Sequence, residues 1–322
     1  MTGQRLAGLD ALRGIAAMCV VLFHLWPQQM ANAYLAVDLF FMLSGYVMAR
    51  NFEPAFAAGL TPGQFLRVRY LRLWPIMAIG GLLHLPIFLD QNGPALLPVA
   101  AVNLLLLPLP LRGLVFPLNG PSWSIFFELL ANALHAAGLW RLSAARLGVM
   151  VAAMAAVLAL VAALSQHSLE VGMRPEAFWA GVPRVLMSYC GGMLLWRLWR
   201  DSPPIAVPGW AGLALLPLYV GVNILQGGSR WPVDLMFVTI GGALAVAGAL
   251  RMTAVPRWLV WLGSISFPLY AVHGAAAAAA LALGLGKIMA IAAALAAASA
   301  VAAIEPGLRR AFAAYRPRAI SL

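Results

Sequence analysis

The stretch LDALRGIAAMCVVLFHLW, residues 9–26, is almost entirely apolar but contains Arg13 and His24. In an α-helix, at about 100° per residue, these two side chains return to within about 20° of each other and lie roughly 16 Å apart along the axis. A cation and an imidazole are costly in hydrocarbon unless they face a polar interior. The stretch therefore predicts a membrane helix whose Arg13 and His24 face a cavity. The alternative is a packed histidine with an arginine anchored at the interface.

Composition places the chain in a membrane. Its 322 residues are 63% hydrophobic and only 10% charged, with a mean hydropathy of +0.89. A soluble domain of this length could not cover such a chain with polar surface. The net charge of +11 is the balance of 21 basic and 10 acidic residues, and all but one of the basic residues are arginines that interrupt apolar runs. That pattern is typical of charges that set membrane topology, so we expect no nucleic-acid partner.

Eleven apolar runs are candidate membrane spans, and one of them is short. The run at 95–107 has fewer than the roughly 20 residues that a helix needs to cross a bilayer, and it leads into the proline-rich segment PLPLRGLVFPLNGP. The other ten runs are 11–26, 34–49, 73–89, 122–140, 147–165, 180–196, 208–226, 232–250, 259–283 and 286–306.

The basic residues indicate whether the short run crosses. If it does not cross, and the N-terminus is cytoplasmic, the cytoplasmic side carries fifteen arginines: Arg5, Arg50, Arg67, Arg69, Arg72, Arg141, Arg146, Arg197, Arg200, Arg251, Arg257, Arg309, Arg310, Arg316 and Arg318. The outer side then carries Arg112, Arg174, Arg184, Arg230 and Lys287. If the run crosses, each side carries ten, so the positive-inside rule favours the first arrangement. The prediction is an all-α polytopic membrane protein of about ten transmembrane helices, with both termini cytoplasmic and 95–107 forming a short re-entrant or interfacial helix.

Two groups of polar residues separate by depth in this topology. Histidines and carboxylates from four helices converge toward the outer side, while arginines gather at the cytoplasmic side. This division suits the transfer of a chemical group through the membrane. The outer group is His24, Asp38, Glu128 and His273, and the cytoplasmic group is Arg13, Arg67, Arg69 and Arg72.

These residue types suit group transfer to a hydroxyl. A histidine that titrates near neutral pH removes a proton from an attacking hydroxyl, and an adjacent carboxylate can hold its tautomer. Arginine presents a planar fork that binds phosphate. The sequence has no G-x-S-x-G motif, no glycine-rich phosphate loop and no H-E-x-x-H motif. Its histidines are dispersed over separate helices, so we expect no metal site.

Five short blocks follow one another between residues 9 and 273. They are LDALRGIAAMCVVLFH with its Arg-x10-His spacing, AVDLFFMLSGYVM at 36–48, RYLRLWP at 69–75, GPSWSIFFE at 120–128 and GSISFPLYAVH at 263–273. In this order they resemble the motifs of the acyltransferase-3 family of integral membrane acyltransferases. Ala36 stands where that family usually has glycine, and Phe267 where it usually has tyrosine.

The resemblance implies an O-acyltransferase that moves an acyl group, usually acetyl from acetyl-CoA, to a hydroxyl of a saccharide or lipid-linked sugar. Acyl-CoA would approach from the cytoplasm, and the acceptor would lie at the outer side of the cytoplasmic (inner) membrane. Such a reaction would modify polysaccharides of the cell envelope. We expect a membrane acyltransferase domain at 1–308, a basic cytoplasmic tail at 309–322, and the stand-alone form without a fused hydrolase-like domain.

Residue types and motif positions together give the candidate site. The expected catalytic residues are His24, Glu128 and Asp38. The expected acyl-CoA-binding residues are Arg13, Arg67, Arg69 and Arg72. The expected acceptor-binding residues are Ser44, Trp123, Ser124, Tyr270 and His273.

Two other classes of protein fit some of these features. A transporter or flippase would also carry buried charges, but it is expected to show an internal repeat with matched broken helices, and the two halves show no convincing repeat. The other large class of polytopic acyltransferases, which acts on lipids or proteins, would use a histidine in a central helix, here His135. We otherwise expect His84 and His135 to be packed core histidines.

Overall fold

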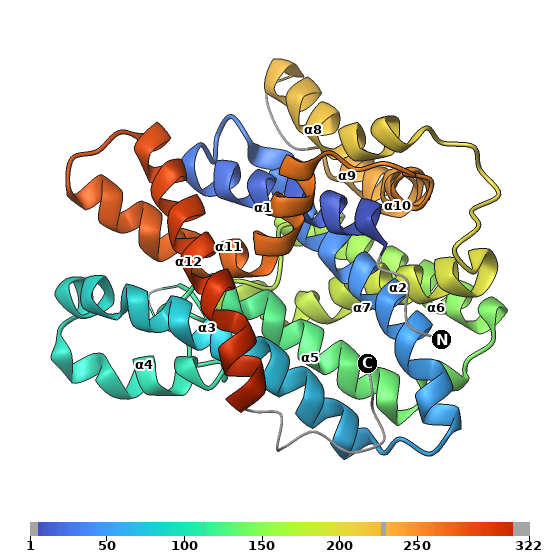
Figure 1. The fold of residues 1–322 in the computed structure, drawn as a ribbon, viewed down its shortest axis with the longest axis horizontal. Helices are drawn as coiled ribbons and strands as arrows, with labels where there is room; N and C mark the ends of the chain where they lie inside the picture. The colour runs from blue at the N-terminus through green and yellow to red at the C-terminus, as the bar shows by residue number, and fades with distance from the viewer. Residues whose placement is uncertain (1–5, 112, 227–229, 312–322) are drawn as a thin grey trace.

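Helices make up most of the chain that the structure describes. The structure is a computed structural model that describes residues 6–111, 113–226 and 230–311, and these residues form helices joined by loops (Figure 1). The predicted all-helical fold is confirmed. Arg5, Arg112, Arg316, Arg318 and residues 312–322 of the predicted tail lie outside the described residues.

Twelve α-helices and six short 3-10 or π segments are assigned in the described ranges. The α-helices are α1 (Ala7–Leu25), α2 (Ala36–Ala57), α3 (Pro62–Asn92), α4 (Leu97–Leu104), α5 (Ser122–Ala137), α6 (Ala144–Val161), α7 (Gly181–Trp199), α8 (Gly209–Gln226), α9 (Trp231–Met236), α10 (Gly242–Leu250), α11 (Arg257–Ala282) and α12 (Lys287–Ala311). The short segments are η1 (Ala31–Leu35), η2 (Pro94–Leu96), η3 (Leu139–Arg141), η4 (Ala162–Gln166), η5 (Pro175–Ala180) and η6 (Phe237–Gly241).

Seven helical segments of the described chain are long and apolar enough to cross a membrane. They are Ala7–Leu25, Ala31–Ala57, Pro62–Asn92, Ala144–Leu164, Trp231–Leu250, Arg257–Ala282 and Lys287–Ala311. The other three predicted spans form α5, α7 and α8. Of these, α5 has only 16 residues, and α7 contains Arg184 and Arg197.

Helix α3 begins eleven residues earlier than the apolar run predicted. Thr61 caps its first turn, because its hydroxyl accepts from the Gln64 backbone N–H while the Gln64 side chain accepts from the Thr61 N–H. Pro62 occupies the first helical position, where its missing N–H costs nothing. This part of the helix contains arginines and other polar residues, so it does not belong to the apolar run in the sequence. The early start puts Arg67, Arg69 and Arg72 on the same helix as the apolar run.

The short run at 95–107 forms α4, which folds back against α3. The Trp74 indole Nε1 donates to the Leu104 carbonyl at 2.9 Å, and the Tyr70 hydroxyl donates to the Leu105 carbonyl at 3.3 Å. After α4 the chain leaves helical geometry at Leu106, whose φ is +61°. The segment therefore turns back beside α3 and ends as an irregular loop before α5 begins.

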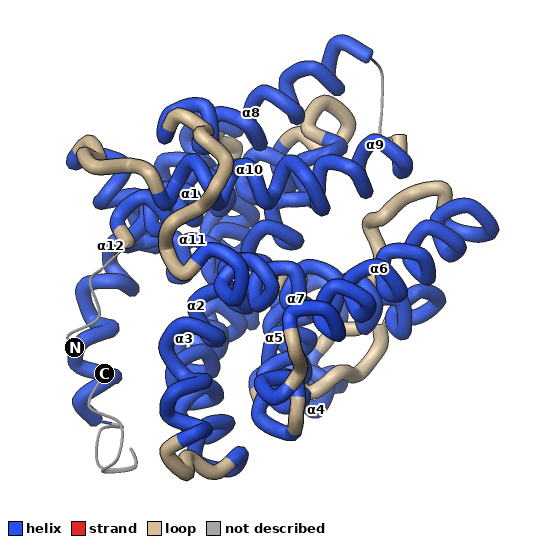
Figure 2. Tube along the Cα trace, turned by 90° about the vertical axis from the view of Figure 1, so that its right-hand side faces the viewer, coloured by secondary structure: helices blue, strands red, loops and turns tan. Residues whose placement is uncertain are grey.

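Helices α2 and α11 lie at the centre of the bundle. In the most apolar 18-residue stretch of the span Ala31–Ala57, 83% of the residues are buried, against 22% in the corresponding stretch of α12. Small residues let α11 approach its neighbours closely. A Cβ on Gly14 of α1 would lie 2.8 Å from the Gly263 nitrogen, and a Cβ on Gly80 of α3 would lie 2.2 Å from the Ala271 oxygen. These contacts place α1 and α3 against α11. Helices α8, α9 and α10 lie together in the upper part of the view (Figure 2), and α10 packs against α1, where a Cβ on Gly8 would lie 1.9 Å from the Ala249 oxygen.

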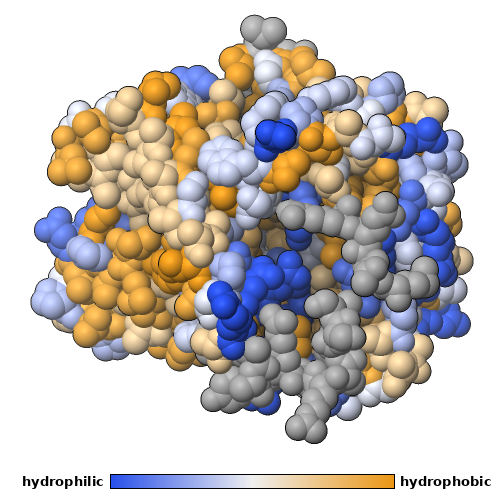
Figure 3. Space-filling view, viewed as in Figure 1, coloured by the Kyte–Doolittle hydropathy of each residue, from blue (hydrophilic) through white to orange (hydrophobic). Residues whose placement is uncertain are grey.

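The periphery of the bundle is apolar. Leu160 of α6, Ile288 and Ile304 of α12 and Leu83 of α3 are all about half exposed or more. Figure 3 shows a largely hydrophobic surface over α3, α4, α11 and α12, with hydrophilic residues beside the C-terminal half of α12. Large exposed apolar surfaces of this kind are unusual in soluble proteins and mark contact with lipid. The protein is a membrane protein.

Candidate active site

A cavity of about 440 Å³ lies among α1, α2, α3, α5, α11 and α12. Its lining brings together seven of the predicted site residues: Arg13, Ser44, Arg69, Arg72, Ser124, Glu128 and Tyr270. Residues that were not predicted also line it, including Asp10, Glu305 and Arg309. We call it the arginine cavity, after Arg13, Arg69, Arg72 and Arg309.

Glu128 joins three helices within the arginine cavity. One of its carboxylate oxygens, Oε1, accepts from Ser44 Oγ of α2 at 2.7 Å and from Arg69 Nη2 of α3 at 2.7 Å. Arg69 is only 3% exposed, and its Nε has no hydrogen-bond partner among the residues that the structure describes. Glu128 therefore lies with Arg69 and Ser44, and it does not share a cavity with His24.

The other predicted arginines differ in their access to the arginine cavity. Arg13 and Arg72 both line it, and an Arg13 Nη1 lies 3.8 Å from the Asp10 carboxylate one turn earlier. Arg72 is exposed, and the charges of Arg13 and Arg69 both act on it. Arg67 is exposed on α3 and does not belong to the cavity lining.

A second cavity, of about 40 Å³, contains His24. We call it the histidine cavity; it is lined by Val20, Phe23, His24, Tyr34, Val37, Gly120, Pro121, Trp123, Glu170, Val171, Met173, Arg184 and Tyr270. Val37 and Tyr270 also line the arginine cavity, so the two cavities meet at these residues. His24 is an exposed residue at the end of α1.

The contacts of His24 and His273 with backbone carbonyls and with each other determine which nitrogen of each neutral ring carries the hydrogen. The His273 Nδ1 lies 3.0 and 2.9 Å from the Leu269 and Tyr270 carbonyl oxygens, which can only accept. That nitrogen therefore carries the hydrogen, and Nε2 has the lone pair. The His24 Nδ1 lies 3.2 Å from His273 Nε2 and 2.9 Å from the Val20 oxygen, so it donates to these acceptors. The lone pair of His24 is consequently on Nε2.

Ser124 and Tyr270 form a hydrogen bond where the two cavities meet. Their oxygens are 2.7 Å apart. The Ser124 hydroxyl lies 3.1 Å from the Pro121 carbonyl oxygen. The Tyr270 hydroxyl also reaches the Pro121 carbonyl, at 3.5 Å, so either hydroxyl can donate to the other. The pair links α11 to the start of α5.

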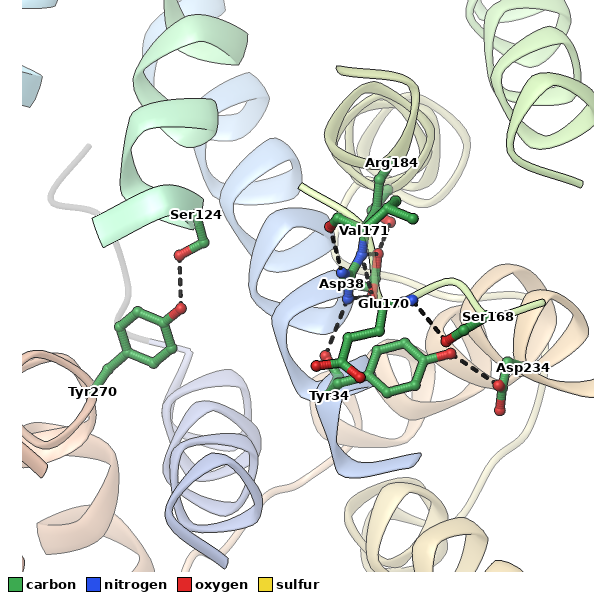
Figure 4. Close-up of polar contacts among 10 residues, drawn as sticks. Tyr34, Asp38, Ser124, Ser168, Glu170, Val171, Arg184, Asp234 and Tyr270 are labelled. Carbon is green, nitrogen blue, oxygen red and sulfur yellow. Dashed lines mark hydrogen bonds and ion pairs between the residues drawn. The ribbon is translucent and has the colours of Figure 1, made fainter. Parts of the chain in front are cut away.

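Asp38 is paired with Arg184, on the other side of α2 from the Ser124–Tyr270 pair in the view of Figure 4. Arg184 Nε lies 3.1 Å from both Asp38 oxygens, and Nη2 lies 2.7 Å from Oδ2. The remaining donors of Arg184 reach the Val171 carbonyl at 3.0 Å and the Tyr34 carbonyl at 3.2 Å. Ser188 Oγ also donates to Asp38 at 3.3 Å. We expected Asp38 to orient His24, but the structure pairs it with Arg184.

Trp123 is packed into the wall of the histidine cavity. It is only 7% exposed, and the Arg184 guanidinium lies 5.3 Å from its ring centroid. Gly172 has a φ of +100°, and a Cβ there would lie 2.9 Å from the Trp123 ring. Because Arg184 and Gly172 cover the ring, Trp123 holds the wall of the cavity and offers little open face for a ligand.

Sequence reasoning missed two buried charged residues of this region. Arg184 is 1% exposed and Asp234 is fully buried. Asp234 accepts from the hydroxyls of Tyr34 at 2.8 Å and Tyr219 at 2.6 Å, and from the Asn32 side chain. Figure 4 shows Tyr34 between the Arg184 group and Asp234. The available signal was a charged residue inside an apolar run, which is the same signal that marked Arg13.

Glu170 is a third residue that the sequence did not single out. It precedes η5 and lines the histidine cavity with His24 and Arg184. Its backbone N–H donates to Ser168 Oγ at 3.0 Å. Burial raises the pKa of the Glu170 carboxyl, although the nearby charges of Arg184 and Arg174 act in the opposite direction.

His273, His84 and His135 all lie outside the lining of both cavities. His135 is fully buried, and its Nδ1 lies 2.8 Å from the Tyr189 hydroxyl. His84 Nδ1 lies 2.6 Å from the Leu118 carbonyl. Neither residue lines the arginine or the histidine cavity. Within the described ranges, no group of three or more His, Cys, Asp and Glu residues is arranged to hold a metal ion.

Comparison with known proteins adds relatives of three kinds. A 185-residue segment, 50% of the chain, is 37% identical to "Protein 2 in picA locus" of Rhizobium radiobacter and covers 95% of that protein. Over 263 residues, 74% of each chain, the identity to the exopolysaccharide production protein ExoZ of Rhizobium meliloti (strain 1021) is 27%. A 41-residue segment is 44% identical to a putative O-acetyltransferase of Staphylococcus aureus (strain COL), but it covers 13% of this chain and 7% of that relative. No solved structure matches the chain.

The family comparison covers nearly the whole chain. Residues 6–304 match the family described as "Acyltransferase domain". This range includes all five sequence blocks, both cavities except Arg309 and Glu305, and the His24–His273 pair. The chain therefore belongs to the acyltransferase-3 family of membrane acyltransferases.

Proposed function

We propose that this protein is a membrane O-acyltransferase that moves an acyl group, in particular acetyl, from acyl-CoA to a hydroxyl of a saccharide or lipid-linked sugar. The observation that carries the proposal is the meeting of the two cavities at Val37 and Tyr270. Arginines on one side suit the phosphates of the donor. An accessible histidine on the other side suits the acceptor hydroxyl. The names of two relatives, a putative O-acetyltransferase and an exopolysaccharide production protein, support acetyl as the group and a saccharide as the acceptor.

The donor would lie in the arginine cavity with its acyl end toward Tyr270. Of the arginines expected to bind it, Arg13 and Arg72 both line the cavity and are at least partly exposed. Arg69 is buried and held by Glu128, so Glu128 would fix Arg69 at the inner part of the cavity. Arg67 lies outside the cavity lining, and the proposal assigns it no contact with the donor.

His24 would act as the general base. Its Nε2 lone pair would take the proton of the acceptor hydroxyl as the hydroxyl oxygen attacks the thioester carbonyl carbon. The new C–O bond forms while the C–S bond breaks, and the proton passes from His24 to the departing thiolate. His273 and the Val20 carbonyl accept from His24 Nδ1 and so hold the ring with Nε2 available.

We also propose the membrane arrangement that the transfer requires. α5, α7 and α8 would join the seven candidate spans to give ten crossings, with α4 re-entrant, both termini cytoplasmic and the chain in the inner membrane. The return of α4 along α3 supports the re-entrant assignment. The excess of arginines on the side of Arg72 and Arg309 supports a cytoplasmic mouth for the arginine cavity.

The test is acetyl transfer in membrane vesicles that contain the native acceptor, supplied with radiolabelled acetyl-CoA. His24→Ala should lower the rate by about 10²–10⁴-fold, the usual effect of losing a general base, without changing protein abundance. His84→Ala and His135→Ala serve as matched controls because neither residue lines a cavity. Full activity in a well-expressed His24→Ala protein, or loss of activity confined to His135→Ala, would overturn the proposed mechanism.

A further inference from the structure

The last helix contributes to the arginine cavity although no sequence block points to it. The five blocks end at residue 273, whereas Glu305 and Arg309 of α12 both line the cavity. They form an ion pair one helical turn apart, between Arg309 Nη2 and Glu305 Oε1. Figure 3 shows hydrophilic residues beside the C-terminal half of α12, next to the apolar surface over α3 and α12.

Arg309 belongs to a cluster of like charges. Four arginines from α1, α3 and α12 line the one cavity, and the charges of Arg13, Arg69 and Arg309 all act on Arg72. Asp10, Glu128 and Glu305 each lie within 4 Å of one of the other three arginines. Arg72 is exposed and forms no such pair among the described residues. A cluster of this kind repels itself and attracts an anion.

Comparison with Arg310 distinguishes a general role of Arg309 at the end of α12 from a specific role in the cavity. Both arginines are in the last turn of α12, where a positive side chain interacts favourably with the negative end of the helix dipole. Both also fit the positive-inside rule. Only Arg309 lines the cavity, however, while the Arg310 Nε donates to the Pro306 carbonyl at 3.3 Å. The helix dipole and the positive-inside rule apply equally to both arginines, so neither explains why Arg309 lines the cavity and Arg310 does not.

The arginines also differ in exposure, which gives the cavity a direction. The Arg309 side chain is 48% exposed and that of Arg13 is 32% exposed, whereas that of Arg69 is 4% exposed. The exposed end is thus the mouth, and Arg69 marks the inner end. A linear donor with its acyl end toward Tyr270 must leave its nucleotide end at the mouth. The nucleotide end of coenzyme A carries the 3′-phosphate.

We propose that Arg309 is a further donor-binding residue and that it binds the 3′-phosphate of coenzyme A at the mouth of the arginine cavity. The inference rests on the proposed acyl-CoA donor. Without a donor, Glu305 holds Arg309; when the donor binds, the phosphate takes the place of Glu305 as the anion facing the guanidinium. The last helix then closes the donor site that α1 and α3 begin.

The test measures binding of coenzyme A and of dephospho-coenzyme A, which lacks the 3′-phosphate, to the purified full-length protein by calorimetry at constant ionic strength. The wild type should bind coenzyme A more tightly than dephospho-coenzyme A. Arg309→Ala should weaken coenzyme A binding about tenfold, as expected for one charge-assisted contact, and leave dephospho-coenzyme A binding unchanged. Arg309→Lys should restore part of the loss, because lysine keeps the charge without the planar fork. Arg310→Ala should bind both ligands as the wild type does.

Different results would overturn different parts of the argument. If Arg309→Ala and Arg310→Ala weaken binding equally, general surface charge explains the effect and the assignment of Arg309 fails. If Arg309→Ala weakens both ligands equally, Arg309 does not bind the 3′-phosphate. If the wild type binds coenzyme A and Arg309→Ala changes nothing, this inference fails while the proposed donor stands. If the wild type binds no coenzyme A, both fail. Equal unfolding temperatures of the Arg309 and Arg310 variants would show that the comparison is between folded proteins.

Discussion

Removing one partner of the Asp38–Arg184 pair should destabilise the protein more than removing both. Asp38 is 2% exposed and Arg184 1%, and two guanidinium nitrogens hold the carboxylate. Arg184→Met leaves a buried carboxylate without its cation, and such a change costs about 3–5 kcal/mol. Adding Asp38→Asn removes the uncompensated charge. We expect Arg184→Met alone to lower the free energy of unfolding by about 3–5 kcal/mol and the double variant to recover about 2 kcal/mol of this loss.

The double-mutant cycle is measured as unfolding of the purified protein in mixed micelles of increasing denaturing detergent content. Arg50 and Asp201 provide a matched pair, joined at 2.8 Å but with side chains 18% and 29% exposed. Because water screens that pair, its coupling should not exceed about 1 kcal/mol. The reasoning fails if the Asp38 and Arg184 effects add to within about 0.5 kcal/mol, since additivity is the behaviour of independent sites.

The same variants test whether Asp38 acts on His24. If Asp38 acts through Arg184, then Asp38→Asn should lower kcat no further once Arg184→Met is present. If Asp38 instead supports the imidazolium of His24, Asp38→Asn should reduce kcat in both backgrounds by a similar factor. A comparable loss of kcat in the Arg184→Met background would therefore show that Asp38 acts on catalysis independently of Arg184. It would support the catalytic role of Asp38 that was expected from the sequence.

Two further predictions concern topology and pH. A cysteine in place of Gln91 should react with a membrane-impermeant reagent from outside, and a cysteine in place of Arg146 only from inside. Background labelling should be low because both native cysteines are buried. External labelling at position 146 would mean that the α4 segment crosses the membrane. Burial raises the pKa of Glu170 above 4.5, so the folded protein holds this proton more tightly than the unfolded chain and stability should fall as pH rises from about 4.5 through the raised value. Thermal unfolding across this range should show a smaller fall for Glu170→Gln than for the wild type. Glu176→Gln, which changes a carboxylate that does not line the histidine cavity, should match the wild type. Identical profiles for the wild type and Glu170→Gln would contradict the assignment.

The helical fold and much of the arginine cavity could be predicted from the sequence. Apolar runs define helices well because a helix satisfies its own backbone hydrogen bonds in lipid. The helical period placed Arg13 on a face that does line a cavity. The R-x-x-R pair, Arg69 and Arg72, reaches the same cavity because residues three apart lie on one face of α3. These features depend on local sequence alone.

The partners of buried charges could not be predicted in the same way. Asp38 and Arg184 are separated by 146 positions, and they meet because α2 and α7 pack closely at Gly45 and Gly192. A Cβ on Gly45 would lie 1.9 Å from the Tyr189 oxygen, and a Cβ on Gly192 would lie 1.9 Å from the Met42 oxygen. The sequence placed Arg184 only as an outer-side charge, because nothing in its own helix indicates the neighbour it will contact.

Depth along the membrane fixes one coordinate of a side chain, and the rotation of its helix fixes another. Asp38 and Glu128 were both expected beside His24 from depth, yet Asp38 turns to Arg184 and Glu128 to Arg69. The carboxylate that shares the histidine cavity with His24 is Glu170, which comes from the segment before η5 and belongs to no predicted span. The His24 ring is instead oriented by a neutral histidine and a backbone carbonyl. If His24 takes a proton from the acceptor, its charge must therefore be stabilised by these neutral acceptors, because the Asp38 carboxylate is already paired with Arg184.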